Sequence, residues 1–273
     1  MAMGKIHPTA VIDTDAELDS SVTVGPFTTI GPHVRIAAGT SIGSHCVIEG
    51  RTTIGTDNTI FQFNSLGAVP QDKKYAGEPC ELVIGDRNTI REFCTFNIGT
   101  ANDKAVTRLG NDNWIMAYVH LAHDCQIGSH TIFANNSQLA GHVHVGDWVI
   151  LGGFTVVRQF LRLGAHSFTA MCTLLFADLP PYVTCQGQPA SARTVNAEGL
   201  RRRGFSAARI ATVRAMHKAL YRENLTFEAS KERILQIARD KPESQEDVAM
   251  MLDFLAAVSP KVGIVRSRRR SVD

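Results

Sequence analysis

Aliphatic residues recur at every sixth position along most of the first 170 residues, and many of them are followed by glycine or alanine. The first run comprises Ile6, Ile12, Leu18, Val24, Ile30, Ile36, Ile42, Ile48, Ile54, Ile60 and Leu66. The same phase returns at Ile84, Ile90 and Phe96. A phase shifted by one residue follows at Leu109, Ile115, Leu121, Ile127, Phe133, Leu139, Val145, Leu151, Val157 and Leu163. A period of six fits neither an amphipathic helix nor a two-sided strand.

This period fits a coil with short flat faces, each of which places one aliphatic side chain in a central core and turns at a small residue. Three such faces form an 18-residue turn, so the sequence predicts a mainly β protein, a parallel β-helix. Successive coils are expected to stack at the inter-strand distance of about 4.8 Å. The spacing leaves the handedness of the coil open.

The hexads are interrupted twice, near residues 70–82 and near residues 100–108, and both segments are polar. A solenoid tolerates insertions as loops that project from the stack, so we expect two loops there. Loops on a rigid scaffold are favoured places for ligand contacts, although a plain surface loop is commoner. The β-helix is expected to span residues 1–190.

Helical signals replace the hexads after residue 190. Ser206, Thr226 and Ser244 each precede apolar residues at helical spacing and are candidate N-caps. The helical faces are expected to contain Ile210, Val213, Met216 and Leu220, then Ile234, Leu235 and Ala238, then Val248, Met251, Leu252 and Leu255. We therefore expect a small α-helical domain over residues 191–273.

The composition of the chain says more about its cellular compartment than about its function. The net charge is only +2, and the six cysteines form no CxxC pair, so they are expected to be reduced and mostly buried. The N-terminal residues lack the apolar segment of a signal peptide, and no apolar run approaches the length of a membrane span. We expect a cytoplasmic protein without an integral membrane segment.

The 18-residue turn places residues 18 apart beside one another. His123, Gly141 and Gln159 form one such column, and Asp124, His142 and Phe160 form the next. A histidine oriented by an aspartate is a suitable general base, and a glycine N–H is a suitable donor to a developing oxyanion. No serine or cysteine in this register is an evident nucleophile, which favours direct attack by a substrate hydroxyl over an acyl-enzyme.

Two other interpretations of the histidines remain open at this stage. His120, His123, His142 and His144 are able to bind a metal, as histidines do in carbonic-anhydrase-like proteins of the same architecture. Alternatively, the histidines have structural roles on the surface or between subunits.

Several segments resemble one enzyme family over nearly the whole chain. They are HLAHDC at 120–125, ANN at 134–136, LAGH at 139–142, QDKKYAGEP at 71–79 and VNAEGLRRRGFS at 195–206. Together they resemble the UDP-N-acetylglucosamine O-acyltransferases, which catalyse the first step of lipid A biosynthesis for lipopolysaccharide. The resemblance implies left-handed coils and a homotrimer with active sites between neighbouring β-helices. It implies transfer of an (R)-3-hydroxyacyl group from acyl carrier protein to the 3-hydroxyl of UDP-N-acetylglucosamine.

The resemblance also implies roles for individual residues. His123 is expected to be the general base, Asp124 its orienting partner and the Gly141 N–H the oxyanion donor. The substrate groove is expected to be lined by Asp72, Lys74, His120, His142 and Gln159. The uridine diphosphate end is expected to be held by Asn196, Glu198, Arg202 and Arg203, and arginines suit phosphate oxygens. The family implies no metal and no other cofactor.

Two positions depart from the family pattern. Arg158 stands where family members often have histidine, with no evident consequence. Met171 stands where long-chain enzymes have a glycine that leaves the acyl groove open. Because a side chain that blocks a groove excludes several carbons at once, we expect a shorter, 3-hydroxydecanoyl-like donor rather than 3-hydroxymyristoyl.

Basic residues gather after the β-helix, and acyl carrier protein is strongly acidic. The cluster comprises Arg193, Arg201, Arg202, Arg203, Arg209, Arg214, Lys218 and Arg222. Electrostatic steering of the carrier is the favoured interpretation, since no nucleic-acid-binding motif accompanies the cluster. Other candidate functions are the related N-acyltransferase, a metal-dependent hydratase and a non-catalytic scaffold. The N-acyltransferase has a uridine-binding domain before its hexads, whereas here the hexads begin at Ile6.

Overall fold

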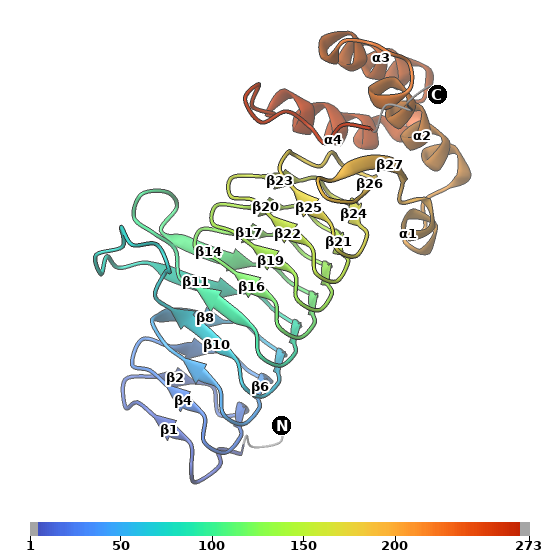
Figure 1. Ribbon diagram of the computed structural model, residues 1–273. Helices are drawn as coiled ribbons and strands as arrows, with labels where there is room; N and C mark the ends of the chain where they lie inside the picture. Colours follow the sequence, from blue (N-terminus) through green and yellow to red (C-terminus); the bar gives the residue numbers. More distant parts are fainter. Residues whose placement is uncertain (1–4, 268–273) are drawn as a thin grey trace.

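The computed structural model describes residues 5–267, without the side chains of Asp240 and Pro242. The chain winds into a three-sided β-helix with helices at its C-terminal end (Figure 1). From β4 to β25, each strand pairs in parallel with the strand three places earlier in the chain, and this pairing gives three sheets. The predicted parallel β-helix followed by a small helical region is thereby confirmed.

The first sheet comprises β1 (Val11–Ile12), β4 (Thr29–Ile30), β7 (Val47–Ile48), β10 (Ser65–Ala68), β13 (Thr95–Asn97), β16 (His120–Leu121), β19 (Gln138–Leu139), β22 (Val156–Val157) and β25 (Leu174–Leu175). The second sheet comprises β2 (Glu17–Leu18), β5 (Arg35–Ile36), β8 (Arg51–Ile54), β11 (Glu81–Ile84), β14 (Val106–Leu109), β17 (Gln126–Ile127), β20 (His144–Val145) and β23 (Arg162–Leu163). The third sheet comprises β3 (Thr23–Val24), β6 (Ser41–Ile42), β9 (Thr59–Ile60), β12 (Thr89–Ile90), β15 (Trp114–Ile115), β18 (Ile132–Phe133), β21 (Ile150–Leu151), β24 (Phe168–Thr169), β26 (Val183–Gln186) and β27 (Ser191–Val195).

The hexad residues form the core, and the small residue after them permits the turn. Ile30 stacks on Ile48 and Ile48 on Leu66, and all three are buried. A side chain at Gly43 would place its Cβ 2.6 Å from the backbone nitrogen of Gln62 in the next coil. Stacking at strand spacing therefore excludes a side chain at this position.

Each coil turns three times, and most corners contain a residue with a left-handed backbone. We call the corner between the first and second sheets the first corner, that between the second and third the second corner, and that between the third and first the third corner. Asp124 (φ 61°) and His142 (φ 64°) occupy the first corner, His166 (φ 62°) the second and Phe154 (φ 58°) the third. This conformation is unusual for residues other than glycine, so it is the coil geometry that imposes it.

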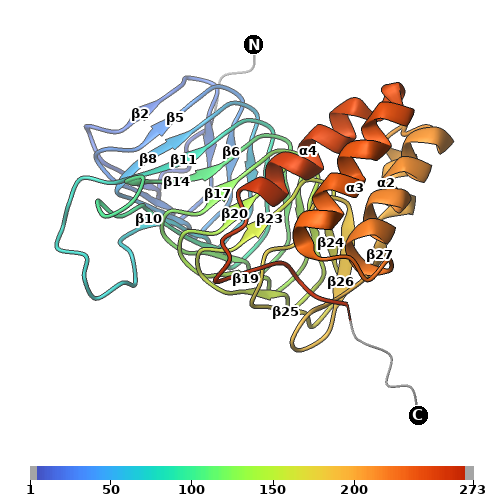
Figure 2. The same cartoon turned by 90° about the horizontal axis from the view of Figure 1, so that it is seen from above.

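The two insertions lengthen single coils without breaking the register. Ile54 pairs with Ile84 thirty residues later, and Ile84 pairs with Leu109 twenty-five residues later, in place of the usual eighteen. The inserted loops project from the same side of the stack (Figures 1 and 2). Strands β11 and β14 start at Glu81 and Val106, so both loops end a few residues earlier than the sequence predicts.

Strands extend slightly further toward the C-terminus than expected. β27 lies beyond residue 190 and pairs antiparallel with β26. After the helices the chain returns to the β-helix, where Ile264 pairs with Asp178 and Ser267 with Ala192. Residues 191–267 are therefore not purely helical, and the rest of the expected 191–273 domain lies outside the described residues.

The helices are α1 (Ala197–Arg202), α2 (Ala207–Tyr221), α3 (Phe227–Asp240), the 3₁₀ turn η1 (Pro242–Ser244) and α4 (Gln245–Ala256). Ser206 and Thr226 cap α2 and α3 through their side chains, as predicted. Ser244 precedes α4, but its hydroxyl bonds to Thr212 instead of capping the helix. Helix α1 is not anticipated by the hexad and helix patterns, and Asn196 caps it.

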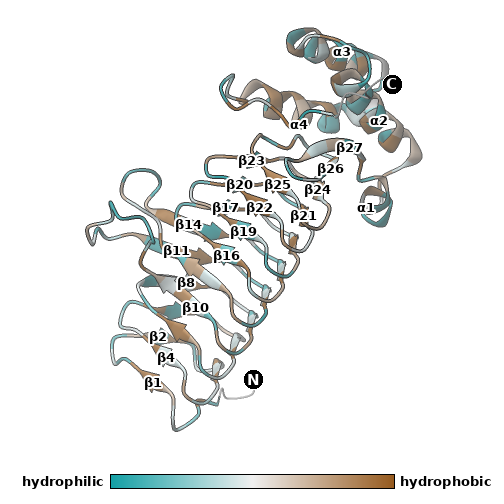
Figure 3. Cartoon of the chain, viewed as in Figure 1, coloured by the Kyte–Doolittle hydropathy of each residue, from teal (hydrophilic) through white to brown (hydrophobic). Residues whose placement is uncertain are grey.

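A small second core joins the helices to the last coils. Tyr182, Val213, Met216 and Met251 belong to this core and are buried. Leu235 is 49% exposed, so its predicted place on the buried face of α3 is wrong, and Ile237 is buried there instead. In Figure 3 much of the ribbon of the projecting loops has the hydrophilic colour, in keeping with their polar sequences. No helix within residues 5–267 is long and apolar enough to cross a membrane.

Candidate active site

An aspartate–histidine pair occupies the first corner. The His123 Nδ1 lies 3.0 Å from the Asp124 Oδ2, and the Asp124 side chain is fully buried. Thr100 holds the same carboxylate with its backbone N–H and with its hydroxyl, the latter at 2.6 Å. Hydrogen bonds from neutral donors compensate the burial of a carboxylate, so Asp124 is fixed as an acceptor beside the imidazole.

Gly141 lies one coil after His123 and packs directly against the His123 ring. A Cβ at this position would approach the ring Cε1 to 2.6 Å and Nε2 to 2.7 Å. Within residues 5–267, the Gly141 N–H has no hydrogen-bond acceptor. The corner therefore presents a free backbone donor beside an oriented imidazole.

His142 forms a second imidazole–carboxylate pair at this corner. Its Nδ1 lies 2.7 Å from the Asp103 Oδ2 and 3.7 Å from the Asp124 Oδ2. The ring stacks on Phe160 at 4.3 Å and meets the His123 ring edge-on at 4.8 Å. The two columns predicted from the 18-residue turn thus lie side by side, joined by a hydrogen bond from the His142 N–H to the His123 carbonyl oxygen.

A cavity of about 650 Å³ opens beside these residues. It is lined by Asp72 and Lys74 from the first inserted loop, and by Thr100, Asn102 and Asp103 from the second, together with His142, His144, Phe160 and Arg162. The Lys74 N–H donates to the Asp72 Oδ1, which forms a turn within the loop. The insertions therefore supply one wall of the site and the β-helix supplies the other.

His120 and Gln159 flank the corner. His120 lies on β16, its Nδ1 is 2.7 Å from the Thr95 hydroxyl, and burial lowers the pKa of the His120 imidazole. Gln159 is exposed, in the same column as His123 and Gly141. His120 directly precedes the first corner, and Gln159 lies within it.

The residues expected at the uridine diphosphate end lie at or near the second corner. The Asn196 side chain caps α1 and donates to the His166 carbonyl oxygen. The Arg203 guanidinium lies 3.0 Å from the His166 Nδ1 and 5.0 Å from the Trp148 ring centre. Glu198 pairs with Arg202 on the surface of α1. A single chain does not bring this group to His123.

Met171 lies at the third corner and is 71% exposed. One coil earlier, the same column contains Gly153, where a Cβ would meet nothing closer than the Asn135 carbonyl oxygen at 3.4 Å. In this column, the side chain of Met171 therefore comes directly after a glycine that leaves open space. The expected site residues are thus divided among all three corners of the β-helix.

Comparison with known proteins identifies the family of this chain. Residues 178–265 match the second domain of the UDP-N-acetylglucosamine O-acyltransferase family, and residues 107–141 match the bacterial transferase hexapeptide repeats. An acyl-carrier-protein–UDP-N-acetylglucosamine O-acyltransferase of Albidiferax ferrireducens is 72% identical over 97% of this chain and all of that protein. This chain belongs to the UDP-N-acetylglucosamine O-acyltransferase family.

Solved members of the family share the whole fold. The LpxA structure from Acinetobacter baumannii is 43% identical, with a TM-score of 0.90 over 96% of this chain and 99% of that one. The UDP-N-acetylglucosamine acyltransferase of Francisella novicida is 37% identical, with a TM-score of 0.92 over 97% and 95%. The family resemblance seen in the sequence is confirmed.

The basic cluster expected to attract the family's carrier protein is only partly free. Arg209 bonds to Asp247 through both ends of its guanidinium, and Arg203 is engaged at the second corner. Arg193, Arg201, Arg202, Arg214, Lys218 and Arg222 are exposed, and Arg201 and Arg202 pair with Glu198. The exposed members surround the start of the helical region.

The four histidines considered for a metal are not brought together. His120 lies on the first sheet and His144 on the second, while His123 and His142 share the corner. Among the described residues, His123, Asp124 and His142 offer ligand atoms within 4.8 Å of one another. Both Nδ1 atoms, however, already face carboxylates, and Thr100 donates to Asp124.

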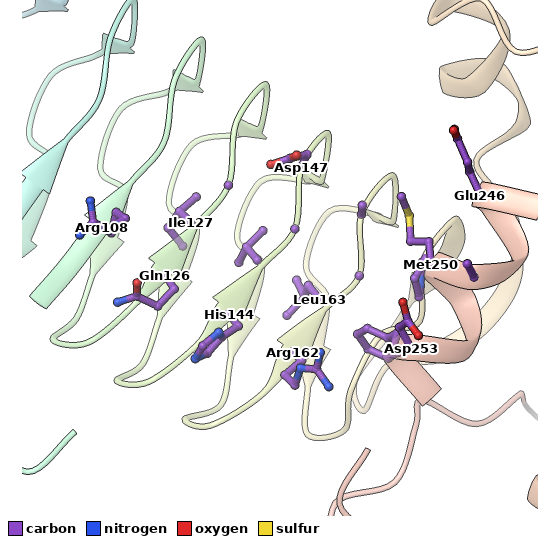
Figure 4. Close-up of a pocket in the computed structure, with 18 residues that line it drawn as sticks. Arg108, Gln126, Ile127, His144, Asp147, Arg162, Leu163, Glu246, Met250 and Asp253 are labelled. Carbon is purple, nitrogen blue, oxygen red and sulfur yellow. The ribbon is translucent and has the colours of Figure 1, made fainter. Parts of the chain in front are cut away.

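A second cavity, of about 860 Å³, lies between the second sheet and α4. Arg108, Gln126, His144 and Arg162 form a row across four successive strands of this sheet, and Glu246, Met250 and Asp253 extend from α4 (Figure 4). Burial, assisted by Lys104 and Arg162, lowers the pKa of the His144 imidazole. Arginines line the strand side of this cavity, and acidic residues line its α4 side.

Among the site residues that sequence reasoning missed, Thr100 and Asp103 are the ones that contact Asp124 and His142. Both lie in the second insertion, which is not periodic, so no register relates them to the first corner. Its polar composition beside a histidine-rich column is the one signal that points to them.

Proposed function

We propose that this chain transfers an (R)-3-hydroxyacyl group from acyl carrier protein to the 3-hydroxyl of UDP-N-acetylglucosamine, the first step of lipid A biosynthesis. The observation that carries the proposal is the Asp124–His123 pair packed against the free backbone N–H of Gly141. The relatives' shared name, with coverage of nearly the whole chain, supports the choice of substrates.

In the proposed mechanism, the His123 Nε2 accepts the proton of the sugar 3-hydroxyl as the hydroxyl oxygen attacks the thioester carbonyl carbon. Asp124 holds the Nδ1 proton and stabilises the imidazolium that forms. The Gly141 N–H donates to the oxyanion. When the intermediate collapses, the carbon–sulfur bond breaks and His123 returns the proton to the departing thiolate of the carrier.

The side chains at the corner favour this direct route over an acyl-enzyme. Cys125 follows Asp124 but is buried, and burial raises the pKa of its thiol to about 12. It is therefore a protonated thiol near neutral pH, and the thiolate is the nucleophilic form. The Thr100 hydroxyl donates to the Asp124 carboxylate and not to an imidazole.

The distribution of site residues over three corners supports a homotrimer with sites between subunits. A neighbouring β-helix that presents its second or third corner to the first corner would complete the site with groups that one chain keeps apart. Arg203 and Asn196 would then approach the diphosphate from the neighbour, and Met171 would limit the acyl groove. The exposed cations near α1 and α2 would steer the acidic carrier protein.

Exposure of Met171 after the open Gly153 supports a short acyl groove. A 3-hydroxydecanoyl-like donor is the proposed preference, since each further carbon would meet the methionine side chain.

The test is product analysis by mass spectrometry with UDP-N-acetylglucosamine and (R)-3-hydroxyacyl carrier proteins of increasing length. The native protein should give ester product, with most turnover for the shorter donors, and His123→Ala should lower kcat/KM roughly 1,000-fold. Absence of product with every donor would overturn the function, and full activity of His123→Ala would overturn the base.

A metal-dependent hydratase is the second candidate, because His123, Asp124 and His142 offer ligand atoms within 4.8 Å. Zinc bound stoichiometrically to the purified protein, and turnover abolished by a chelator, would favour it. Activity that is unchanged by a chelator would favour acyl transfer by acid–base catalysis.

A further inference from the structure

The second imidazole–carboxylate pair, Asp103 with His142, is not used by the mechanism above. The Asp103 Oδ2 lies 2.7 Å from the His142 Nδ1, closer than Asp124 lies to His123. The Asp103 side chain is 34% exposed at the rim of the cavity, whereas the His142 side chain is 13% exposed. The second insertion thus places a carboxylate on an imidazole of the β-helix.

The His142 ring is held on several sides at once. One face stacks on Phe160, its plane stands at 86° to the His123 ring, and its own backbone N–H donates to the His123 carbonyl oxygen. His142 lines the cavity, and within residues 5–267 its Nε2 has no hydrogen-bond partner. The one ring nitrogen left for a ligand is therefore Nε2.

A carboxylate accepts hydrogen bonds and cannot donate them when ionised, so Asp103 favours the tautomer with the proton on Nδ1. The Nε2 of a neutral imidazole then carries a lone pair and accepts a hydrogen bond. We propose that Asp103 is a positioning residue that fixes the His142 Nε2 as the acceptor for a substrate hydroxyl in this cavity.

The rest of the lining suits a hydroxyl-bearing ligand. Asp72 and Asp103 are balanced by Lys74 and Arg162, and Asn102 adds an amide. Mixed charges of this kind suit a neutral polar group better than a phosphate. The identity of the hydroxyl rests on the proposed function, which offers two sources: the 3-hydroxyl of the acyl chain and a hydroxyl of the sugar.

Steady-state kinetics of Asp103→Ala and Asp103→Asn, with saturation of each substrate in turn, test the role. Asp103→Ala should raise one KM roughly 10-fold while kcat changes less, because a hydrogen bond to a bound hydroxyl is weakened while His123 and Gly141 keep their places. Asp103→Asn should recover part of the loss, since its amide oxygen is still able to accept from the Nδ1–H. Asp112→Ala, which breaks an exposed ion pair with Arg87, is the matched control and should leave both KM values unchanged.

Donors with and without the 3-hydroxyl distinguish the two sources. If the acyl hydroxyl is bound, the native preference for hydroxylated donors should fall roughly 10-fold in Asp103→Ala. If a sugar hydroxyl is bound, that preference should persist and the KM for UDP-N-acetylglucosamine should rise.

The ¹⁵N shifts of the His142 ring, assigned with His142→Gln, report the tautomer without any turnover. The native ring should be protonated on Nδ1, and Asp103→Ala should shift it toward a mixture. An unchanged tautomer together with unchanged KM values in both Asp103 variants would overturn the role. A native protein that turns over no donor would instead overturn the proposed function, while the ring shifts would still test Asp103.

Discussion

The first and second corners have nearly the same backbone and opposite chemistry. His142 and His166 both adopt left-handed φ values, at 64° and 62°, and each stacks on an aromatic ring of the next coil. At the first corner, inserted loops place Asp103 and Thr100 beside the histidine column and leave a cavity. At the second corner, helices cover the column, and burial with the Arg203 cation lowers the pKa of His166 to about 4.

The comparison shows that the coil fixes where the imidazoles lie, whereas the loops or helices that cover each corner determine how reactive they are. A stacked imidazole with a carboxylate on Nδ1 is oriented for acid–base work or for hydroxyl binding. A stacked imidazole beside a guanidinium and under a helix stays neutral, and its nitrogen accepts a hydrogen bond from Arg203.

The largest loss of activity is expected when the carboxylate partner of His123 at the first corner is removed. Asp124→Asn should lower kcat roughly 1,000-fold, because an amide no longer stabilises the imidazolium of His123. Single-turnover product formation measures this loss. Thermal unfolding should show that the variant remains folded, and Asp112→Asn is the control expected to retain kcat. A kcat within a few fold of the native value would contradict the role of Asp124.

The next largest effect is expected from crowding the imidazole. Gly141→Ala would place a methyl group against the His123 ring, which must move, so kcat should fall roughly 100-fold. Gly31→Ala is a matched control, since its Cβ would meet only ordinary contacts, at 3.4 Å or more. The same rate measurement applies. Equal losses in both variants would show that the effect is general strain rather than displacement of His123.

Met171→Gly tests the third corner with a smaller change. If the exposed methionine closes the acyl groove, donors two to four carbons longer should gain roughly 10-fold or more in kcat/KM. Competition between two donors in one reaction, read by mass spectrometry, gives the ratio directly. An unchanged ratio would mean that chain length is set elsewhere.

The smallest expected effect concerns stability and the covered histidines. Burial lowers the pKa of His166 and of His217 to about 4, below the ordinary value of 6.5. The unfolded chain therefore binds protons more readily, so the free energy of unfolding should fall as pH drops from 6.5 toward 4 and level off below. Each histidine contributes at most about 2 kcal/mol between pH 7 and pH 5.

Urea unfolding of the native protein and His217→Phe at pH 7, 6 and 5 checks this sign. The variant should lose less stability on acidification, because its ring has no proton to bind. A steeper loss in the variant would mean that His217 is already charged in the folded protein.

Particular residues show why prediction from the sequence succeeded and where it stopped. Ile30, Ile48 and Leu66 recur at fixed spacing and stack, so the sheets and the His123–Gly141 column follow from counting. Ser206 and Thr226 likewise cap the helices that their spacing predicts. Leu235 was misplaced because a helical face depends on what packs against it, and Ile237 meets the core instead.

The hexad repeat and the helical spacing alone are enough to predict the three-sheet β-helix, the helical end and the neighbours within each column. Each of these depends on a repeat or on contacts between nearby residues, and periodicity records both. That Thr100 and Asp103 meet Asp124 and His142, and that Arg203 lies at the second corner, follows from the folded structure and from no spacing along the chain. An aperiodic loop contacts the β-helix through its own hydrogen bonds. No spacing along the chain specifies which residues those hydrogen bonds join.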